Sequence, residues 1–269
     1  MASDSPALPS APVINVGPNV VLQPPLSRCG RGPGLVLITP TGYGACQDNN
    51  KSLDPPPLQK WAEESFAVAQ ISLSPETSER AGSVLEQVRM AQHALETLAE
   101  CDKKDKFGLI GENLSVSPAI SLISTVYGSR ADFVPQFGGI LQSIAAAGKF
   151  AGAVCFDDWK LSDIPSLIHL DKTKPEAQSA ETSKVYSYSE VSSSGFIIPG
   201  HADFDYPSAG VAHSRTLTFI KSKLGAPYFD LEKIWDEHTY LEFGERSVEK
   251  TMATMVQEPY VNHVSTVSL

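Results

Sequence analysis

Residues 106–115 read Lys106-Phe-Gly-Leu-Ile-Gly-Glu-Asn-Leu-Ser115. The apolar run 107–110 is typical of a buried strand, and the small residues Gly111 and Ser115 around a polar centre indicate a tight turn into a helix. Asn113 stands at the middle of this turn, and asparagine tolerates the positive φ of tight turns better than most side chains do. A neutral carboxamide cannot act as a nucleophile. The turn can therefore keep its shape without supplying covalent catalysis.

Strand-like and helix-like segments alternate through most of the chain. Apolar runs predict strands over 13–22, 34–39, 66–73, 107–110, 151–156, 165–170 and 185–188. Helical spacing predicts helices over 58–64, 80–100, 114–127, 136–148 and 206–224, the last ending at Gly225. This alternation predicts an α/β protein, a mostly parallel sheet with helices on both faces.

Ligands bind beyond the carboxyl ends of the strands in such sheets. That rule selects five loops as candidate site segments: 40–46, 111–115, 157–162, 171–183 and 192–206.

Composition excludes several classes of function. The 269 residues carry 21 Lys and Arg against 31 Asp and Glu, a net charge of -10, which disfavours nucleic acid and anionic lipid as partners. The sequence shows no secretory signal and no apolar stretch long enough to span a membrane. The four cysteines are scattered, which indicates neither a zinc site nor a disulfide framework. We expect a cytoplasmic protein without a metal or cofactor.

We expect three parts along the chain. Residues 1–12 form a disordered lead-in, residues 13–225 the α/β domain, and residues 226–269 a short helical extension. Asp230 and Ser247 are expected to cap two helices in that extension.

Four local features of residues 13–225 resemble the dienelactone hydrolase branch of the α/β-hydrolases. Gly34-Leu-Val-Leu-Ile-Thr39 resembles the strand that leads into the oxyanion hole, and residues 80–115 resemble the helix, strand and turn that carry the nucleophile. Pro199-Gly-His-Ala-Asp-Phe204 resembles the loop of the catalytic histidine, and Ser214-Arg-Thr-Leu-Thr-Phe219 the last helix. The resemblance implies an α/β-hydrolase-like fold.

Carried over residue by residue, the resemblance leaves the catalytic triad incomplete. Asn113 occupies the nucleophile position and His201 that of the general base. Lys174 falls near the position of the acid, with Asp171 as an imperfect substitute and Asp157 and Asp158 as further candidates.

Other residues of the same loops are candidates for the oxyanion hole or for substrate binding. The Leu114 amide would point into the hole with a partner amide from Thr41 or Gly42. The remaining candidates are Tyr43, Glu112, Asp157, Asp158, Trp159, Phe204 and Tyr206. Each has a structural alternative: Asn113 as a turn residue, His201 as a structural histidine, and the aromatic residues as anchors packed on the core.

The extension 226–269 resembles the opening of the small cone-shaped α+β domains related to nuclear transport factor 2. The segment Trp235-Asp-Glu-His-Thr-Tyr-Leu-Glu-Phe243 carries this resemblance, but too few residues follow it for a complete domain. A short apolar helical pair needs a surface to pack on, so we expect docking on the main domain or a homodimer through residues 226–269.

Two hypotheses and a third possibility follow. The first is an enzyme without a covalent nucleophile that orients a small apolar or polyketide-like substrate for a Diels–Alder or related ring closure. The resemblance suggests fungal secondary metabolism as its setting. The second is a lactone or ester hydrolase in which His201 activates water. The third is a binding protein that keeps only the fold.

Overall fold

The computed structural model describes residues 11–27, 29–40, 55–73, 81–111, 144, 148–156, 164–174, 182–199, 201–225 and 231–253. These fall into two compact units, one that reaches Gly225 and one that holds residues 231–253.

An eight-stranded sheet with the order β1-β2-β4-β3-β5-β6-β7-β8 organises the first unit. β1 and β2 pair antiparallel, β2 also runs antiparallel to β4, and all other neighbours are parallel. The strands are β1 Ile14–Gly17, β2 Val20–Gln23, β3 Gly34–Pro40, β4 Ala67–Leu73, β5 Phe107–Gly111, β6 Phe150–Cys155, β7 Ser166–Asp171 and β8 Ser183–Tyr188. The chain is therefore an α/β protein with a mostly parallel sheet.

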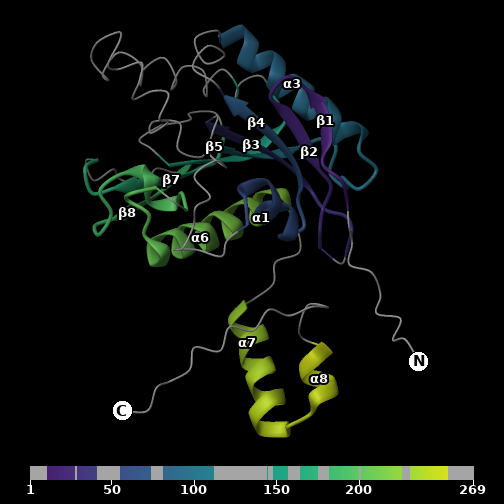
Figure 1. The fold of residues 1–269 in the computed structure, drawn as a ribbon, viewed down its shortest axis with the longest axis vertical. Coiled ribbons are helices and arrows are strands. Elements are labelled where there is room, and N and C mark those ends of the chain that lie inside the picture. The colour runs from purple at the N-terminus through teal and green to yellow at the C-terminus, as the bar shows by residue number, and fades with distance from the viewer. Residues whose placement is uncertain are drawn as a thin grey trace. The chain divides into compact units, whose positions relative to one another are not determined.

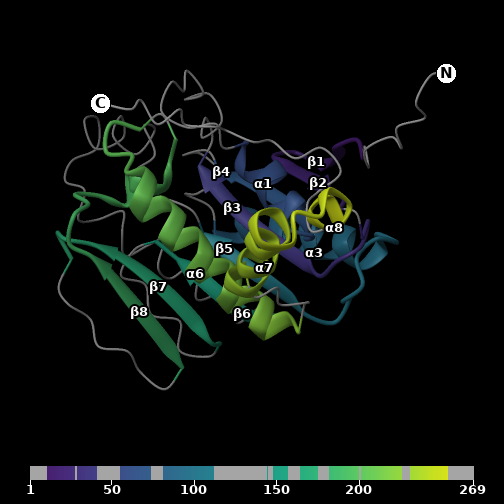
Figure 2. The same cartoon turned by 90° about the horizontal axis from the view of Figure 1, so that it is seen from below.

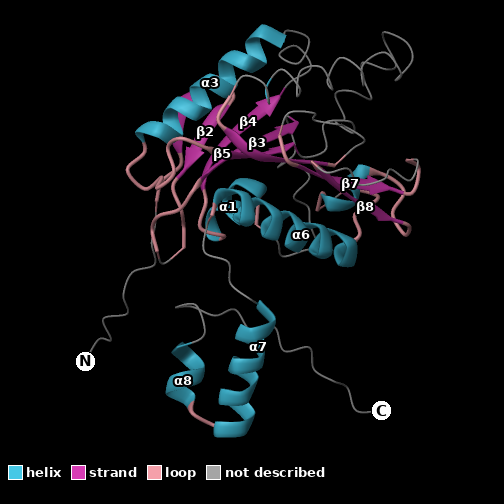
Figure 3. Cartoon of the chain, turned by 180° about the vertical axis from the view of Figure 1, so that it is seen from behind, coloured by secondary structure: helices cyan, strands magenta, loops and turns pink. Residues whose placement is uncertain are grey.

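Helices cover both faces of the sheet. Helix α3 (Ala81–Thr97) lies on one face, while α1 (Pro57–Glu63) and α6 (Tyr206–Leu224) lie on the other (Figures 1 and 3). The apolar side of α3 packs with β2, β3 and β4 in one core cluster, and α1 and α6 contribute to a second. Full burial of a large apolar side chain stabilises the fold by about 1.5–3 kcal/mol. The two clusters thus hold the sheet from both sides.

The prediction of a single edge strand over 13–22 is wrong. The segment folds into the antiparallel pair β1 and β2, with a turn at Pro18 and Asn19. Proline lacks the amide that a ladder needs, and Asn19 adopts a φ of 60°, which asparagine accepts readily. Before β1, the carbonyl of Ala11 accepts a hydrogen bond from Gln23 Nε2 at 3.1 Å.

Helix α6 confirms the predicted range and both of its ends are capped. The Asp205 carboxylate accepts a hydrogen bond from the Ser208 amide at 3.0 Å. At the other end Gly225 adopts a left-handed φ of 63°, and its amide bonds the Lys221 carbonyl. Viewed from below, α6 runs across β5, β6 and β7 (Figure 2). The first turn of α6 follows directly after the loop that carries His201.

The predicted helices over 114–127 and 136–148 lie almost entirely outside the described residues. Ile144 is described, and it is helical and fully buried.

The second unit consists of helix α7 (Leu231–Thr239), a π-helical turn η2 (Tyr240–Glu245) and helix α8 (Val248–Ala253). The Lys250 amide donates to Ser247 Oγ at 3.5 Å, as expected for a cap. Among its described side chains, the large apolar ones that are exposed are Trp235, Tyr240, Phe243, Val248 and Met252. Among the helices that the structure describes, none combines the length and the apolar character needed to cross a bilayer.

Candidate functional site

The parallel strands place the starts of the predicted site loops along one edge of the sheet. In the register of the central strands, Gly111 at the end of β5 lies opposite Ile38 of β3 on one side and Cys155 of β6 on the other. The candidates that follow these strands lie outside the described residues: Thr41, Gly42, Tyr43, Glu112, Asn113, Leu114, Asp157, Asp158 and Trp159. Their side-chain roles therefore stay predictions.

His201 lies in a connection that backbone hydrogen bonds hold tightly. The 3₁₀ helix η1 (Ser194–Ile197) begins after Ser193, whose hydroxyl accepts from the Gly195 amide at 3.2 Å. The His201 amide then donates to the Ile198 carbonyl at 3.1 Å. The His201 carbonyl in turn accepts from the Phe204 amide at 3.1 Å. These consecutive turns fix the backbone on both sides of the imidazole.

The imidazole of His201 packs directly on Gly195. A β-carbon at position 195 would lie 2.4 Å from Nδ1 and 2.5 Å from Cε1, closer than real contacts allow. The side chain of His201 is 26% exposed. Glycine at 195 is thus required for the observed position of the ring, and the ring remains accessible from solvent.

The hydrogen bond at Nδ1 determines what His201 can do chemically. Nδ1 accepts from the backbone amide of Asp203 at 3.1 Å. A ring nitrogen that accepts a hydrogen bond carries no proton, so the neutral imidazole holds its proton on Nε2. Within the described part of the chain Nε2 has no hydrogen-bond partner. Neutral His201 therefore offers a donor at Nε2 rather than a base.

The side chain of Asp203 does not take the place of a triad acid. Its Oδ2 lies 3.9 Å from His201 Nδ1, too far for a hydrogen bond, and accepts from Ser193 Oγ at 2.6 Å. An ion pair between His201 and the Asp203 carboxylate would require a proton on Nδ1. That proton would point at the amide hydrogen of Asp203, which already donates to Nδ1. The shorter amide hydrogen bond is the interaction that the geometry favours.

Asp171, the substitute for the acid, is used within its own turn. It is buried at the end of β7, where Oδ1 accepts from the Thr173 amide at 2.8 Å and from the Thr173 hydroxyl. The Lys174 amide donates to the Asp171 carbonyl at 3.2 Å. The hydrogen bonds of Asp171 among the described residues are thus within its own turn, and none of them joins it to His201.

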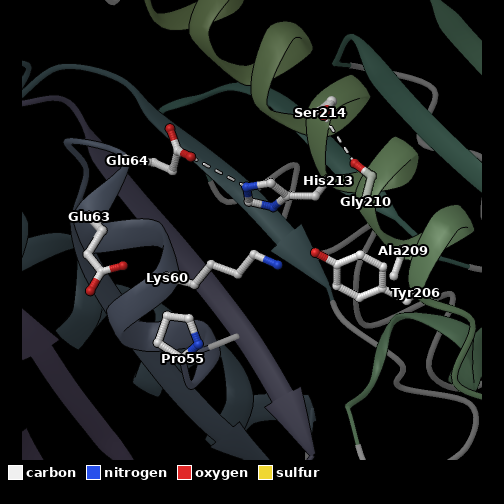
Figure 4. A pocket seen from close by; sticks show the side chains of 9 residues that line it. All are labelled: Pro55, Lys60, Glu63, Glu64, Tyr206, Ala209, Gly210, His213 and Ser214. Carbon is white, nitrogen blue, oxygen red and sulfur yellow. Dashed lines mark hydrogen bonds and ion pairs between the residues drawn. The ribbon is translucent and has the colours of Figure 1, made fainter. Parts of the chain in front are cut away.

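Phe204 and Tyr206 lie where the His201 loop becomes helix α6. Their rings meet edge to face with centroids 6.5 Å apart, Phe204 half-buried and Tyr206 exposed. Tyr206 lines a pocket between α1 and α6 (Figure 4). Neither ring is packed in the two core clusters, so neither is the core anchor that the structural alternative would require.

A second histidine of the sheet region, His169, is buried and acts as a structural element. Nδ1 meets the Tyr188 hydroxyl at 2.9 Å and Nε2 the Thr216 hydroxyl at 3.0 Å, and the ring stacks on Phe156. Burial, and then the charge of Arg215, lowers the pKa of His169 to about 3. The ring is therefore neutral at pH 7 and bonded through both nitrogens.

No family model matches the chain, and no curated protein matches it either. Among the described residues no three His, Cys, Asp or Glu side chains gather in a way that could hold a metal ion. Among the described residues, Cys29, Cys101 and Cys155 are not joined in disulfides.

Sequence reasoning missed the residues that orient His201. Gly195, Ser193 and Asp203 act through backbone groups or through a hydroxyl at a turn, and such roles leave little trace in a pattern of residue types. The only available signal was the serine two residues before a glycine, which is typical of a side-chain cap.

Proposed function

We propose that the chain is an α/β-hydrolase-like protein that binds a carbonyl-bearing substrate by hydrogen bonds and orients it for ring closure, without covalent catalysis. The observation that carries the proposal is the hydrogen bond from the Asp203 amide to His201 Nδ1 at 3.1 Å. It leaves Nε2–H as a donor, which suits the polarisation of a substrate carbonyl. Such a donor cannot remove a proton from water or from a hydroxyl.

The sheet supports the fold part of this proposal. The strand order β1-β2-β4-β3-β5-β6-β7-β8, with β2 antiparallel to both neighbours, agrees with an α/β-hydrolase sheet. In that fold the nucleophile turn begins at the carboxyl end of the central strand β5, and here that strand ends at Gly111. His201 follows β8 and precedes the last helix of the unit, as the histidine of that fold does.

The chemistry would rest on orientation and on a few donors. Holding two reacting parts of one substrate in a near-attack geometry can supply about 7–11 kcal/mol in favourable cases. Asn113, the Leu114 amide and His201 Nε2 would bind the carbonyl oxygen, and Trp159 would shape the apolar part of the pocket. A setting in fungal secondary metabolism belongs to the proposal through the resemblance alone.

The hydrogen bond from the Asp203 amide to His201 Nδ1 also disfavours a lactone or ester hydrolase. A general base needs a lone pair on the nitrogen that faces water, with the other nitrogen donating to an acid. His201 has the opposite arrangement, and Asp171 is bonded to Thr173 instead.

The test combines a hydrolysis assay with a cyclisation assay. Wild-type protein and Asn113→Ser are incubated with activated esters, lactones and a serine-reactive phosphonate. We expect neither turnover nor labelling, because His201 cannot activate the new hydroxyl. Ester turnover by either protein would show a working base and would overturn the proposal.

The cyclisation assay uses a synthetic triene ketone that closes by an intramolecular Diels–Alder reaction. Wild-type protein should accelerate closure and bias the product ratio, and Asn113→Ala and His201→Leu should each lower the rate about tenfold or more. His201→Gln, which keeps a donor, should retain part of the rate, and Trp159→Ala should change the product ratio. Saturable binding of the ketone without acceleration would indicate a binding protein instead.

A further inference from the structure

A pocket between helices α1 and α6 carries an inference independent of the proposed function. It has a volume of about 430 Å³, within the range of small-molecule sites. Its walls include Pro55, Ala209 and Gly210, which offer little more than apolar surface and backbone. The polar residues of its lining are Lys60 and Glu63 of α1, Glu64 directly after α1, and Tyr206, His213 and Ser214 of α6.

His213 is held in place from two sides. Its Nε2 lies 3.6 Å from Oε1 of Glu64, and its ring packs against the Trp61 ring with centroids 4.7 Å apart. The side chain is 19% exposed. Among the described residues Nδ1 has no partner, so this nitrogen is available to a ligand.

The carboxylate of Glu64 is already balanced by a buried ammonium. Lys221 Nζ lies 3.4 Å from Glu64 Oε2, and the side chain of Lys221 is 9% exposed. Burial raises the pKa of Glu64, but His213 and Lys221 together outweigh it and hold the pKa below its ordinary value. Glu64 is therefore ionised and paired, which reduces its repulsion of a further anion.

The second carboxylate beside the pocket is also engaged. Glu63 Oε1 accepts a hydrogen bond from Gln59 Nε2 at 2.8 Å on the exposed surface of α1. In Figure 4 the tips of the Lys60, Tyr206 and His213 side chains point toward the same space. The Glu64 carboxylate lies on the opposite side of the His213 ring.

We propose that this pocket binds a small aromatic carboxylate. The ammonium of Lys60 and the hydroxyl of Tyr206 donate to its two oxygens, while its ring lies against Pro55, Ala209 and Gly210. Charge-assisted hydrogen bonds of this kind are about twice as strong as neutral ones.

The test is a titration of the ¹⁵N-labelled full chain with benzoate, and with benzamide as a neutral ligand of the same shape. Benzoate should shift the amide resonances of residues 206–214 saturably, with a dissociation constant at least tenfold lower than that of benzamide. Lys60→Gln should weaken benzoate binding about tenfold, and Tyr206→Phe, which removes one hydroxyl, about threefold.

Matched variants separate the site from general charge and from folding. Lys104→Gln removes an exposed cation elsewhere and should bind benzoate as the wild type does. Lys60→Gln should lose the preference for benzoate over benzamide while keeping the amide spectrum of the folded chain. Equal affinity for both ligands, an absence of saturation, or unchanged binding by Lys60→Gln would overturn the proposal.

Discussion

The imidazole of His201 rests on the backbone of Gly195, so closely that a β-carbon at position 195 would lie 2.4 Å from Nδ1. This contact, together with the Asp203 amide, sets both the position of the ring and the nitrogen that carries its proton. Gly195 thus sets where the ring lies, and the Asp203 amide sets which nitrogen carries the proton.

Gly195→Ala should displace the His201 ring while the rest of the fold persists. The ring is partly exposed and can swing outward, so we expect a loss of stability of about 1 kcal/mol, below the cost of overpacking a closed core. The imidazole resonances of His201 in a ¹H–¹⁵N NMR spectrum report its displacement, and urea unfolding reports stability.

Gly210→Ala is the matched control for that variant. A β-carbon at position 210 would meet nothing within 4 Å, and alanine favours a helix over glycine by up to about 1 kcal/mol. Unchanged His201 resonances in Gly195→Ala would contradict the close packing described above.

His169 should make the stability of the protein depend on pH. Its pKa falls from the ordinary 6.5 to about 3 in the folded chain, so between these values the unfolded chain binds the extra proton. The stability that His169 contributes is complete above pH 6.5 and decreases on acidification by about 1.4 kcal/mol per pH unit. Urea unfolding between pH 7 and pH 4 measures this slope.

His169→Gln should flatten that slope, although it lowers stability at pH 7 by about 1–3 kcal/mol because Tyr188 and Thr216 lose a partner. The exposed His93→Gln on α3 serves as the control and should keep the wild-type slope. If His169→Gln and wild type lost stability in parallel on acidification, His169 would not be the buried neutral group described here.

Lys221→Met should leave Glu64 without its buried cation. We expect a loss of about 1–2 kcal/mol at pH 7, moderated because the Glu64 side chain is 34% exposed to solvent. Since the folded chain holds the pKa of Glu64 below its ordinary value of 4.5, this contribution is present above that pH and fades as the pH falls further. The difference between wild type and variant should therefore narrow in acid.

Chemical unfolding of the wild type and of Lys221→Met at pH 7 and at pH 3.5 tests whether the difference in stability narrows. Lys104→Met, which removes an exposed lysine, should match the wild type at both values. A constant difference across pH would mean that Lys221 stabilises the fold through packing of its methylenes instead of through Glu64.

The exposed apolar side chains of residues 231–253 should support a homodimer. Trp235 and Phe243 are 67% and 69% exposed, an unusual surface for aromatic residues unless a partner covers them. Sedimentation velocity of the full chain should show a dimer that Phe243→Glu dissociates and that Glu242→Gln, at the neighbouring position, leaves intact. A wild-type monomer at a loading concentration of ~100 μM would rule out a stable interface of standard size.

The sequence predicted secondary structure well where residue type and hydrophobic periodicity indicated the same element. The continuous apolar run 34–39 predicted a strand buried on both faces, which β3 is, and the glycine after Leu224 predicted the end of α6. The hairpin of β1 and β2 was missed because the apolar content of 13–22 outweighed the turn at Pro18 and Asn19. Turn chemistry, not hydrophobicity, decides that segment.

Contacts between residues far apart in the sequence, and contacts made by backbone groups, could not be predicted in the same way. Glu64 and Lys221 are 157 residues apart, and only the packing of α1 beside α6 makes them partners. The role of Asp203 depends on its backbone amide, which every residue except proline possesses. The loop around His201 favours a site role that stays a prediction, and the nitrogen that carries the proton follows only from the geometry around the ring.

The most direct test of the account is the tautomer of His201, measured by long-range ¹H–¹⁵N correlation on the ring-labelled wild-type protein at a pH where the ring is neutral. We predict a protonated Nε2 and an unprotonated Nδ1, as the Asp203 amide requires. A proton on Nδ1 would show instead that an acid orients the ring and leaves Nε2 as a base, which would contradict the donor role and restore the hydrolase.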